Sequence, residues 1–233
     1  MKDFSNRYIM VFSVVMVVSV AILLSLTALL LQPRQEKNVE VEKKIQILSS
    51  MNVSSDRSNA VELYDRHIIE SFVINTEGNR VEGVDAFTVT LRAEQRKPLA
   101  EQSLPMFIAV ADNGDTLHII PLEGKGLWGP IWGYVSLKKD LSTIAGVTFD
   151  HKAETPGLGA EINTTPFEIQ FHDKTIFENG NFVSVKVVKG GARPGNPHEV
   201  DAISGGTITS NGLQAMVHDG LIKYEKYLSQ NRK

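Results

Sequence analysis

The chain of 233 residues contains no cysteine. Disulfide bonds, cysteine-ligated zinc and cysteine-bound iron–sulfur clusters are therefore excluded within it. A strongly basic segment is also missing, since 24 Lys and Arg are balanced by 27 Asp and Glu. Nucleic acid is for this reason not expected as a partner. The six histidines are scattered without a ligand spacing such as His-x3-His, and we predict no metal site.

Charge is absent from one long stretch, residues 8–31, which reads YIMVFSVVMVVSVAILLSLTALLL. About twenty apolar residues suffice for a helix to cross a bilayer core. The stretch is longer than the apolar region of a signal peptide, and no small-residue cleavage site follows it. We predict an uncleaved transmembrane anchor over residues 1–34. Lys2 and Arg7 precede the helix and several basic residues follow it, so the charge distribution leaves the orientation open.

The rest of the chain predicts an α+β fold, because strands and helices are mixed without regular alternation. Helical patterns at residues 35–50 and 60–72 indicate a helical connector over residues 35–70, and residues 71–233 form one domain. A hairpin is expected around Gly78, and residues 211–228 show the spacing of an amphipathic helix. Further strands are predicted at residues 86–91, 106–111, 116–121, 132–137, 143–149, 167–171 and 182–188.

Glycine, by contrast, is concentrated in three segments: residues 124–133 (GKGLWGPIWG), 154–159 (ETPGLG) and 204–207 (SGGT). Such segments let the backbone approach a flat or anionic ligand closely and leave N–H groups free to donate. Tight turns between strands are the alternative explanation for each segment taken alone.

The SGGT segment lies just before the C-terminal helix, which Thr209, Ser210 or Asn211 can cap. A helix start favours a phosphate through its free N–H donors and its dipole. The hydroxyl of Thr207 could hold such a phosphate or be esterified by it. The residues themselves therefore predict a phosphate site and leave the cofactor open.

The run Asp201-Ala-Ile-Ser204-Gly205-Gly206-Thr207 resembles the flavinylation motif, Asp-x-x-Ser-Gly-Ala-Thr, of the FMN-binding domain family. Gly206 replaces the commoner alanine. In that family a FAD-dependent flavin transferase joins FMN to the last threonine through a phosphoester. The resemblance thus implies covalent FMN on Thr207 and a flavin transferase as the partner in maturation.

The order of segments along the whole chain is similar to that of the NqrC family, a family of subunits of the Na+-translocating NADH:quinone oxidoreductase. ETPGLG is shared with the sister flavin subunit of the Rnf complex, whereas GLWGPIWG favours the sodium-pumping reductase. The resemblance implies a single-pass protein of the bacterial inner membrane with a periplasmic domain. It further implies an electron-transfer subunit of a six-subunit complex that reduces ubiquinone, without independent activity.

The resemblance also implies which residues line the flavin. Trp128 is expected near the isoalloxazine ring, whereas we interpret Trp132 as a core aromatic residue. Glu154 has two readings, as part of the flavin site or as a cap on neighbouring backbone N–H groups. The expected cofactor-binding residues are Thr207, Ser204, Gly205, Gly206, Trp128, Glu154, Thr155, Gly157, Leu158 and Gly159.

Three other functions are alternatives to this one. His198, Asp201 and Ser204 could suggest a membrane-anchored serine hydrolase, but three triad members within seven residues rarely reach the required geometry. A binding module without flavin would share the fold but would not need Thr207. The equivalent Rnf subunit would carry the same flavin in a different complex.

Overall fold

The computed structural model describes residues 5–232, so Lys2 in the N-terminal flank lies outside the described residues. The chain forms two compact units, Met1–Lys43 and Lys44–Lys233. Helix α1 (Asn6–Ser50) begins in the first unit, continues through Pro33 and ends in the second. Among the described residues it is the one helix long and apolar enough to cross a membrane, and the side chains of its most apolar stretch are not buried. These properties are those of a membrane anchor.

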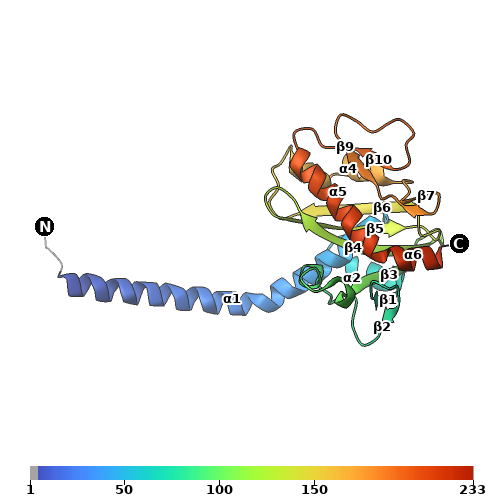
Figure 1. The fold of residues 1–233 in the computed structure, drawn as a ribbon. Helices are drawn as coiled ribbons and strands as arrows, with labels where there is room; N and C mark the ends of the chain where they lie inside the picture. Colours follow the sequence, from blue (N-terminus) through green and yellow to red (C-terminus); the bar gives the residue numbers. More distant parts are fainter. Residues whose placement is uncertain (1–4, 233) are drawn as a thin grey trace. The chain divides into compact units, whose positions relative to one another are not determined.

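The second unit is built around one antiparallel sheet (Figure 1). Its strand order is β2-β1-β3-β4-β5-β6, and every neighbouring pair runs antiparallel. The strands are β1 (Ile68–Ile74), β2 (Arg80–Val81), β3 (Leu104–Val110), β4 (Thr116–Lys125), β5 (Pro130–Leu137) and β6 (Ile144–His151).

Helices and two small strand pairs complete this unit. Strand β9 pairs with β10 in parallel, and β7 pairs with β8 in a hairpin. The additional strands are β7 (Phe177–Glu178), β8 (Asn181–Phe182), β9 (Lys186–Val188) and β10 (Glu199–Asp201). The helices are α2 (Ala60–His67), α3 (Leu91–Glu94), α4 (Thr165–Glu168), α5 (Thr207–Leu221) and α6 (Glu225–Asn231), with 3₁₀ turns η1 (Leu99–Glu101), η2 (Gly159–Asn163), η3 (Ile169–Phe171) and η4 (Ile222–Tyr224).

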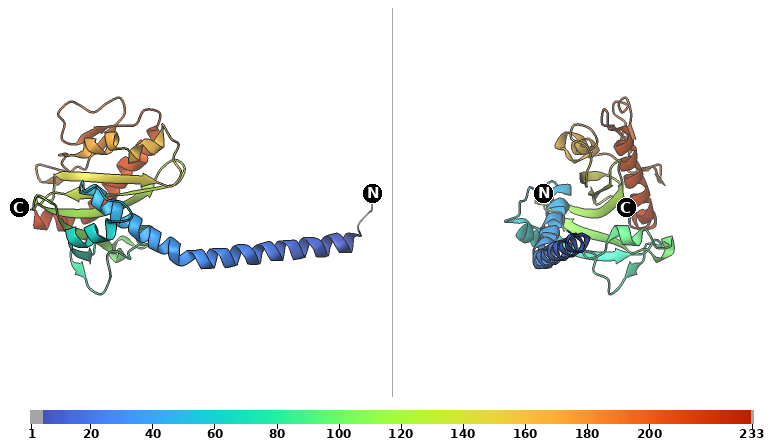
Figure 2. Two further views of the ribbon diagram at one scale, coloured as in Figure 1. Left: turned by 180° about the vertical axis from the view of Figure 1, so that it is seen from behind. Right: turned by 90° about the vertical axis from the view of Figure 1, so that its left-hand side faces the viewer.

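The end of α1 lies on one face of the sheet and α5 lies on the other (Figure 2). Alternate residues of β5, including Ile131 and Val135, face the apolar core beneath α5. The residues between them face the last turns of α1, where the Trp132 indole N–H donates to Gln46 Oε1 at 3.2 Å. The Ser50 and Ser136 hydroxyls lie 2.9 Å apart on the same side. Trp132 is thus half-buried and hydrogen-bonded rather than a residue of the main core.

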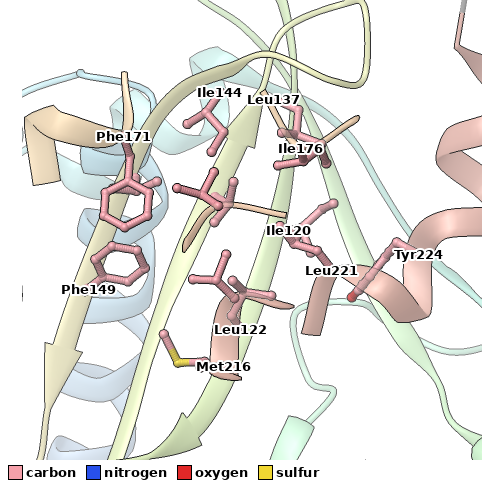
Figure 3. Close-up of a cluster of buried hydrophobic side chains, with 14 of the residues drawn as sticks. Ile120, Leu122, Leu137, Ile144, Phe149, Phe171, Ile176, Met216, Leu221 and Tyr224 are labelled. Carbon is pink, nitrogen blue, oxygen red and sulfur yellow. The ribbon is translucent and has the colours of Figure 1, made fainter. Parts of the chain in front are cut away.

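The main core lies between the sheet and the C-terminal helices (Figure 3). Met216 and Leu221 of α5 point at the sheet, and the buried Tyr224 hydroxyl donates to the Pro105 carbonyl at 2.9 Å. In the same core, Phe149 and Phe171 meet edge to face with ring centroids 5.2 Å apart. This core is closed by residues from β6 and η3 as well as from α5.

The predicted α+β fold is confirmed, and the hairpin at Gly78 and four long strands lie where they were expected. The predicted helix at residues 60–72 is wrong beyond His67. Ile68–Ile74 instead forms β1, because these residues pair with β3 along their length. Long-range pairing here overrides a local helical pattern.

Two predicted strands are wrong. Residues 86–91 form a turn and the start of α3, because the Asp85 carboxylate accepts the Phe87 N–H and its carbonyl accepts the Thr88 hydroxyl. Residues 167–171 are helical, because Pro166 lies in the first turn of α4, where proline's fixed backbone is favourable. The run at 182–188 is divided between β8 and β9, and the C-terminal helix begins at Thr207 rather than at residue 211.

Candidate functional site

The three glycine-rich segments meet around one cavity of about 230 Å³. They come from the β4–β5 hairpin, the loop after β6 and the first turn of α5. Segments that are far apart in the sequence therefore form one site. The cavity is lined by Leu127, Glu154, Thr155, Leu158, Gly159, Gly205, Gly206, Thr207, Ile208 and Thr209.

The SGGT segment connects a strand to a helix. Strand β10 ends at Asp201, and Gly206 precedes the first residue of α5, Thr207. Gly205 has a φ of +74°, a conformation that glycine adopts without strain. A Cβ atom at this position would also lie 2.6 Å from the Leu158 Cδ2 atom. The backbone conformation therefore favours glycine here, and an added Cβ atom would also displace the end of the Leu158 side chain.

The first turn of α5 keeps its backbone donors free. The first N–H of this turn with a partner is that of Ser210, which donates to the Gly206 carbonyl at 2.9 Å. Within residues 5–232, the N–H groups of Thr207, Ile208 and Thr209 have no acceptor. The expected cap by Thr209, Ser210 or Asn211 is wrong, because the helix begins earlier and Gly206 is its N-cap residue. These free donors suit an anion.

Glu154 connects two of the glycine-rich segments to the first turn of α5. Its side chain is 5% exposed, and its Oε1 atom accepts the backbone N–H of Trp128 at 2.9 Å. Its Oε2 atom accepts the hydroxyl of Thr209 at 2.6 Å. The capping role expected as one reading of Glu154 is thus present, and the residue also lines the cavity. Thr209 is not among the predicted site residues, because its pairing with Glu154 spans 55 positions.

Apolar side chains surround the cavity and remain exposed. Leu127, Leu158 and Ile208 line it and are 45%, 42% and 59% exposed, respectively. Trp128, next to Leu127, is 65% exposed. Large apolar side chains left open beside a cavity are typical of a ligand site. Leu127 and Ile208 are not predicted from the sequence, although each adjoins a residue that is.

The structure does not bring every predicted residue to the cavity wall. Thr207, Gly205, Gly206, Glu154, Thr155, Leu158 and Gly159 line it. Ser204, Gly157 and Trp128 do not, although each is adjacent in sequence to a residue that does. Gly157 has a φ of +75° and forms the turn before Leu158.

Two alternative chemistries do not match the local geometry. The ring nitrogen Nδ1 of His198 lies 2.6 Å from the Thr175 carbonyl oxygen, so this histidine is not directed at Ser204 as in a hydrolase triad. Gly124, Gly126 and Gly129 have the Gly-x-Gly-x-x-Gly spacing of dinucleotide-binding proteins. They lead into strand β5 rather than into a helix, so the strand–turn–helix context of that motif is missing.

The fold and the cavity correspond to a known class of domain, since the family described as FMN-binding domain matches residues 126–222. The NqrC subunit of the Na(+)-translocating NADH-quinone reductase from Vibrio vulnificus (strain YJ016) is 32% identical over 200 residues, covering 79% of this chain and 78% of that protein. The equivalent subunit from Pseudomonas aeruginosa is 27% identical over 230 residues, covering 88% of each.

Solved structures agree with this assignment. The crystal structure of the equivalent subunit from Parabacteroides distasonis superimposes with a TM-score of 0.79 at 43% identity, covering 85% of this chain and 96% of that one. The crystal structure of NqrC from Shewanella oneidensis has a TM-score of 0.71 and shares the fold. The chain belongs to the NqrC family of Na+-translocating NADH-quinone reductase subunits. The predicted family, and with it the prediction of a reductase subunit, is confirmed.

The residues of the cavity fit FMN. Added Cβ atoms at Gly159, Gly205 and Gly206 would meet Glu154, Leu158 and Ile203, so glycine lets the cavity walls pack closely. The start of α5 offers free N–H donors for a phosphate. A volume of about 230 Å³ is below the range of roughly 300–1,000 Å³ that is usual for small-molecule sites. A flavin held here would therefore extend over the exposed apolar side chains beside the cavity.

Proposed function

We propose that this chain is the FMN-carrying subunit of a Na+-translocating NADH-quinone reductase, with FMN attached to Thr207 through a phosphoester. In this proposal it relays electrons between redox centres of partner subunits. The observation that carries the proposal is the position of the Thr207 hydroxyl. Thr207 lines the cavity as the first residue of α5, and its hydroxyl makes no hydrogen bond within the described part of the chain.

Other hydroxyl groups near the cavity are less suitable acceptors. Thr209 and Ser210 are each 1% exposed. The Thr209 hydroxyl donates to Glu154, and the Ser210 oxygen accepts the N–H of Ile203 at 3.1 Å. Esterification of either would break a buried hydrogen bond. Ser204 is exposed but does not line the cavity, and Thr155 lines it but lies outside the helix start.

The chain's residues would hold the phosphate mainly through backbone donors. The ten residues that line the cavity include one carboxylate and neither lysine nor arginine. The free N–H groups of the first turn of α5, together with the helix dipole, would hold the anion. Such a site binds phosphate without a full positive charge, and a covalent ester would prevent loss of the cofactor.

The attachment step is balanced with FAD as the donor and a flavin transferase as the enzyme. A new bond forms between Thr207 Oγ1 and the phosphorus of the FMN half. The pyrophosphate bond of FAD breaks, AMP leaves and the threonine proton is released. Bound FMN would then supply the redox chemistry, while the protein supplies position and electrostatics. Leu158, Ile208 and Leu127 would cover the apolar ring and exclude water from it.

We further propose the setting in which this chemistry takes place. Helix α1 would anchor the subunit in the bacterial inner membrane, with the second unit on the periplasmic side. Free FMN is not replenished there, which supports covalent attachment. The partners would be the other subunits of a six-subunit complex, with ubiquinone as the electron acceptor of the whole.

The proposal is tested by the intact mass of the full-length protein after co-expression with a flavin transferase. The wild-type protein should gain about 438 Da, the mass of FMN minus water, as expected for an ester. Thr207→Ala should gain nothing, because no other hydroxyl near the cavity in residues 5–232 combines access to it with the helix start. Ser229→Ala, which removes an exposed hydroxyl on α6, serves as the control and should be modified like the wild type. An unmodified wild type beside an active transferase would contradict the proposal and favour a binding module without flavin.

A further inference from the structure

The buried carboxylate of Glu154 holds together the parts of the chain that form the cavity. One oxygen accepts the N–H of Trp128 in the β4–β5 hairpin, and the other accepts the hydroxyl of Thr209 in α5. Glu154 itself belongs to the third glycine-rich segment. Its own N–H group donates to the ring of His151 at 3.2 Å. Thus all three walls of the cavity meet at one buried side chain.

Two neighbouring glycines leave room for this carboxylate. A Cβ atom at Gly126 would lie 2.5 Å from Glu154 Oε1, and a Cβ atom at Gly159 would lie 2.5 Å from Glu154 Oε2. Neither position has a φ in the left-handed region, so backbone conformation alone does not require glycine there. The two glycines are therefore explained by the space that the carboxylate occupies.

Glu154 contacts α5 through a side chain rather than through the backbone. Thr209 is the third residue of α5, two positions beyond Thr207. Because its hydroxyl provides the hydrogen bond, the N–H groups of Thr207 and Ile208 remain free in the first turn. The carboxylate also lies near the positive end of the helix dipole, which favours a negative charge. The contact fixes the helix start without using the donors that a phosphate needs.

A buried carboxylate is a costly way to join loops. No ion pair of Glu154 is present among the described residues, so its burial depends on hydrogen bonds and the helix dipole. An apolar side chain of similar size would fill the same space at lower cost. The buried carboxylate of Glu154 is therefore better explained by the geometry that it imposes on Trp128 and on the first turn of α5.

We propose that Glu154 and Thr209 form a positioning pair, which orients the Thr207 hydroxyl for attack on the flavin donor and holds the Trp128 hairpin against the cavity. This inference rests on the proposed function, since it concerns the same cofactor. It assigns to Thr209 a role that depends on its hydroxyl, and to Glu154 a role beyond lining the cavity.

The first test measures the rate at which flavin transferase modifies full-length variants with FAD. Thr209→Val keeps the shape of the side chain but removes the donor, and Glu154→Gln removes the charge. Each should lower the rate at saturating acceptor protein by about tenfold, the effect of losing one hydrogen bond to a charged group. The half-saturating concentration of acceptor should stay unchanged, because the exposed motif is still present. Thr209→Ser retains the hydroxyl and should restore the wild-type rate.

A matched control is Glu161→Gln, because Glu161 accepts the Gly157 N–H on the same segment without reaching the cavity. This variant should be modified at the wild-type rate. Loss of modification in Thr209→Ser or in Glu161→Gln to the extent seen in Thr209→Val would contradict the inference.

The second test uses protein without flavin. Amide hydrogen exchange of residues 126–129 should become about tenfold faster in Thr209→Val and Glu154→Gln than in the wild type, because the hydrogen bonds through which Glu154 holds this hairpin are weakened. Unchanged exchange and unchanged modification rates in both variants, with a wild type that is modified normally, would overturn the inference alone. A wild type that is never modified would overturn the proposed function instead. Faster exchange in the variants would then still support a structural role for the contact between Glu154 and Thr209.

Discussion

The main core and the glycine-rich cavity are built in opposite ways. The core beneath α5 consists of large apolar side chains, with Phe149, Phe167 and Phe171 in mutual contact. The cavity consists largely of backbone, glycine and hydroxyl groups joined by the carboxylate of Glu154. The packing of side-chain volume holds the core together, whereas directed hydrogen bonds hold the cavity together.

The two regions therefore contribute different properties to the protein. Burial of apolar area stabilises the fold in rough proportion to the area and without directional preference. A site that must hold an anion and present one hydroxyl needs direction more than area. We therefore expect variants in the core to change stability without changing the chemistry, and variants in the cavity to do the reverse.

The largest effect on stability is expected for Phe171→Ala. Phe171 is fully buried between Phe149 and Phe167, so its truncation should lower the free energy of unfolding by about 3–5 kcal/mol. Denaturant unfolding of the full-length protein in detergent measures this change. Ile169→Ala is the matched control, because Ile169 lies in the same 3₁₀ turn but is 64% exposed and should change little. Folded Phe171→Ala protein should still be flavinylated, and complete loss of modification would break the separation between the two regions.

The same contrast explains how much of the structure can be predicted from the sequence. Features with a local signal, such as the long apolar helix, four strands of the sheet and the SGGT segment before α5, are predicted correctly. Residues 167–171 resemble a strand because Phe167 and Phe171 are apolar and flank a short run. Pro166 and the four-residue spacing of the two phenylalanines favour the observed helical turns, which bring both rings onto Phe149.

The site is predicted only in part, for a related reason. Glycine-rich segments signal close backbone approach, but they do not indicate which segments meet. The contact between Glu154 and Thr209 arises when α5 packs on the sheet, and no local pattern in the sequence indicates it. Leu127 and Ile208 escape prediction because an exposed apolar residue has no distinguishing spacing. Their importance follows only from their position beside the cavity.

A smaller effect on stability, and a larger one on chemistry, is expected for Gly205→Ala. The φ of +74° makes an alanine unfavourable by about 1 kcal/mol, and the added Cβ would displace the end of the Leu158 side chain. The rate of flavin attachment should fall, because the cavity wall moves. Gly195→Ala is a matched control with a φ of +75° and no neighbour within 4 Å of the added atom. It should show a similar loss of stability, measured by denaturant unfolding, and a normal rate of attachment. Equal attachment rates in both variants would show that contact with Leu158 is unimportant.

The smallest effect is expected from an ion pair in the strand that leads to the SGGT segment. The Arg193 guanidinium and its backbone N–H both donate to the Glu199 carboxylate at the start of β10, and they lower the pKa of this carboxyl group to about 2. A depressed pKa stabilises the fold above the ordinary value of 4.5, and this contribution is lost as the pH falls towards 2. The difference in melting temperature between wild type and Glu199→Gln should therefore be present at pH 7 and disappear between pH 4.5 and 2. Because Arg193 is largely exposed, added salt should weaken the effect at pH 7. A difference in melting temperature that persists at pH 2 would mean that Glu199 stabilises the fold through packing, as the core residues do, rather than through its charge.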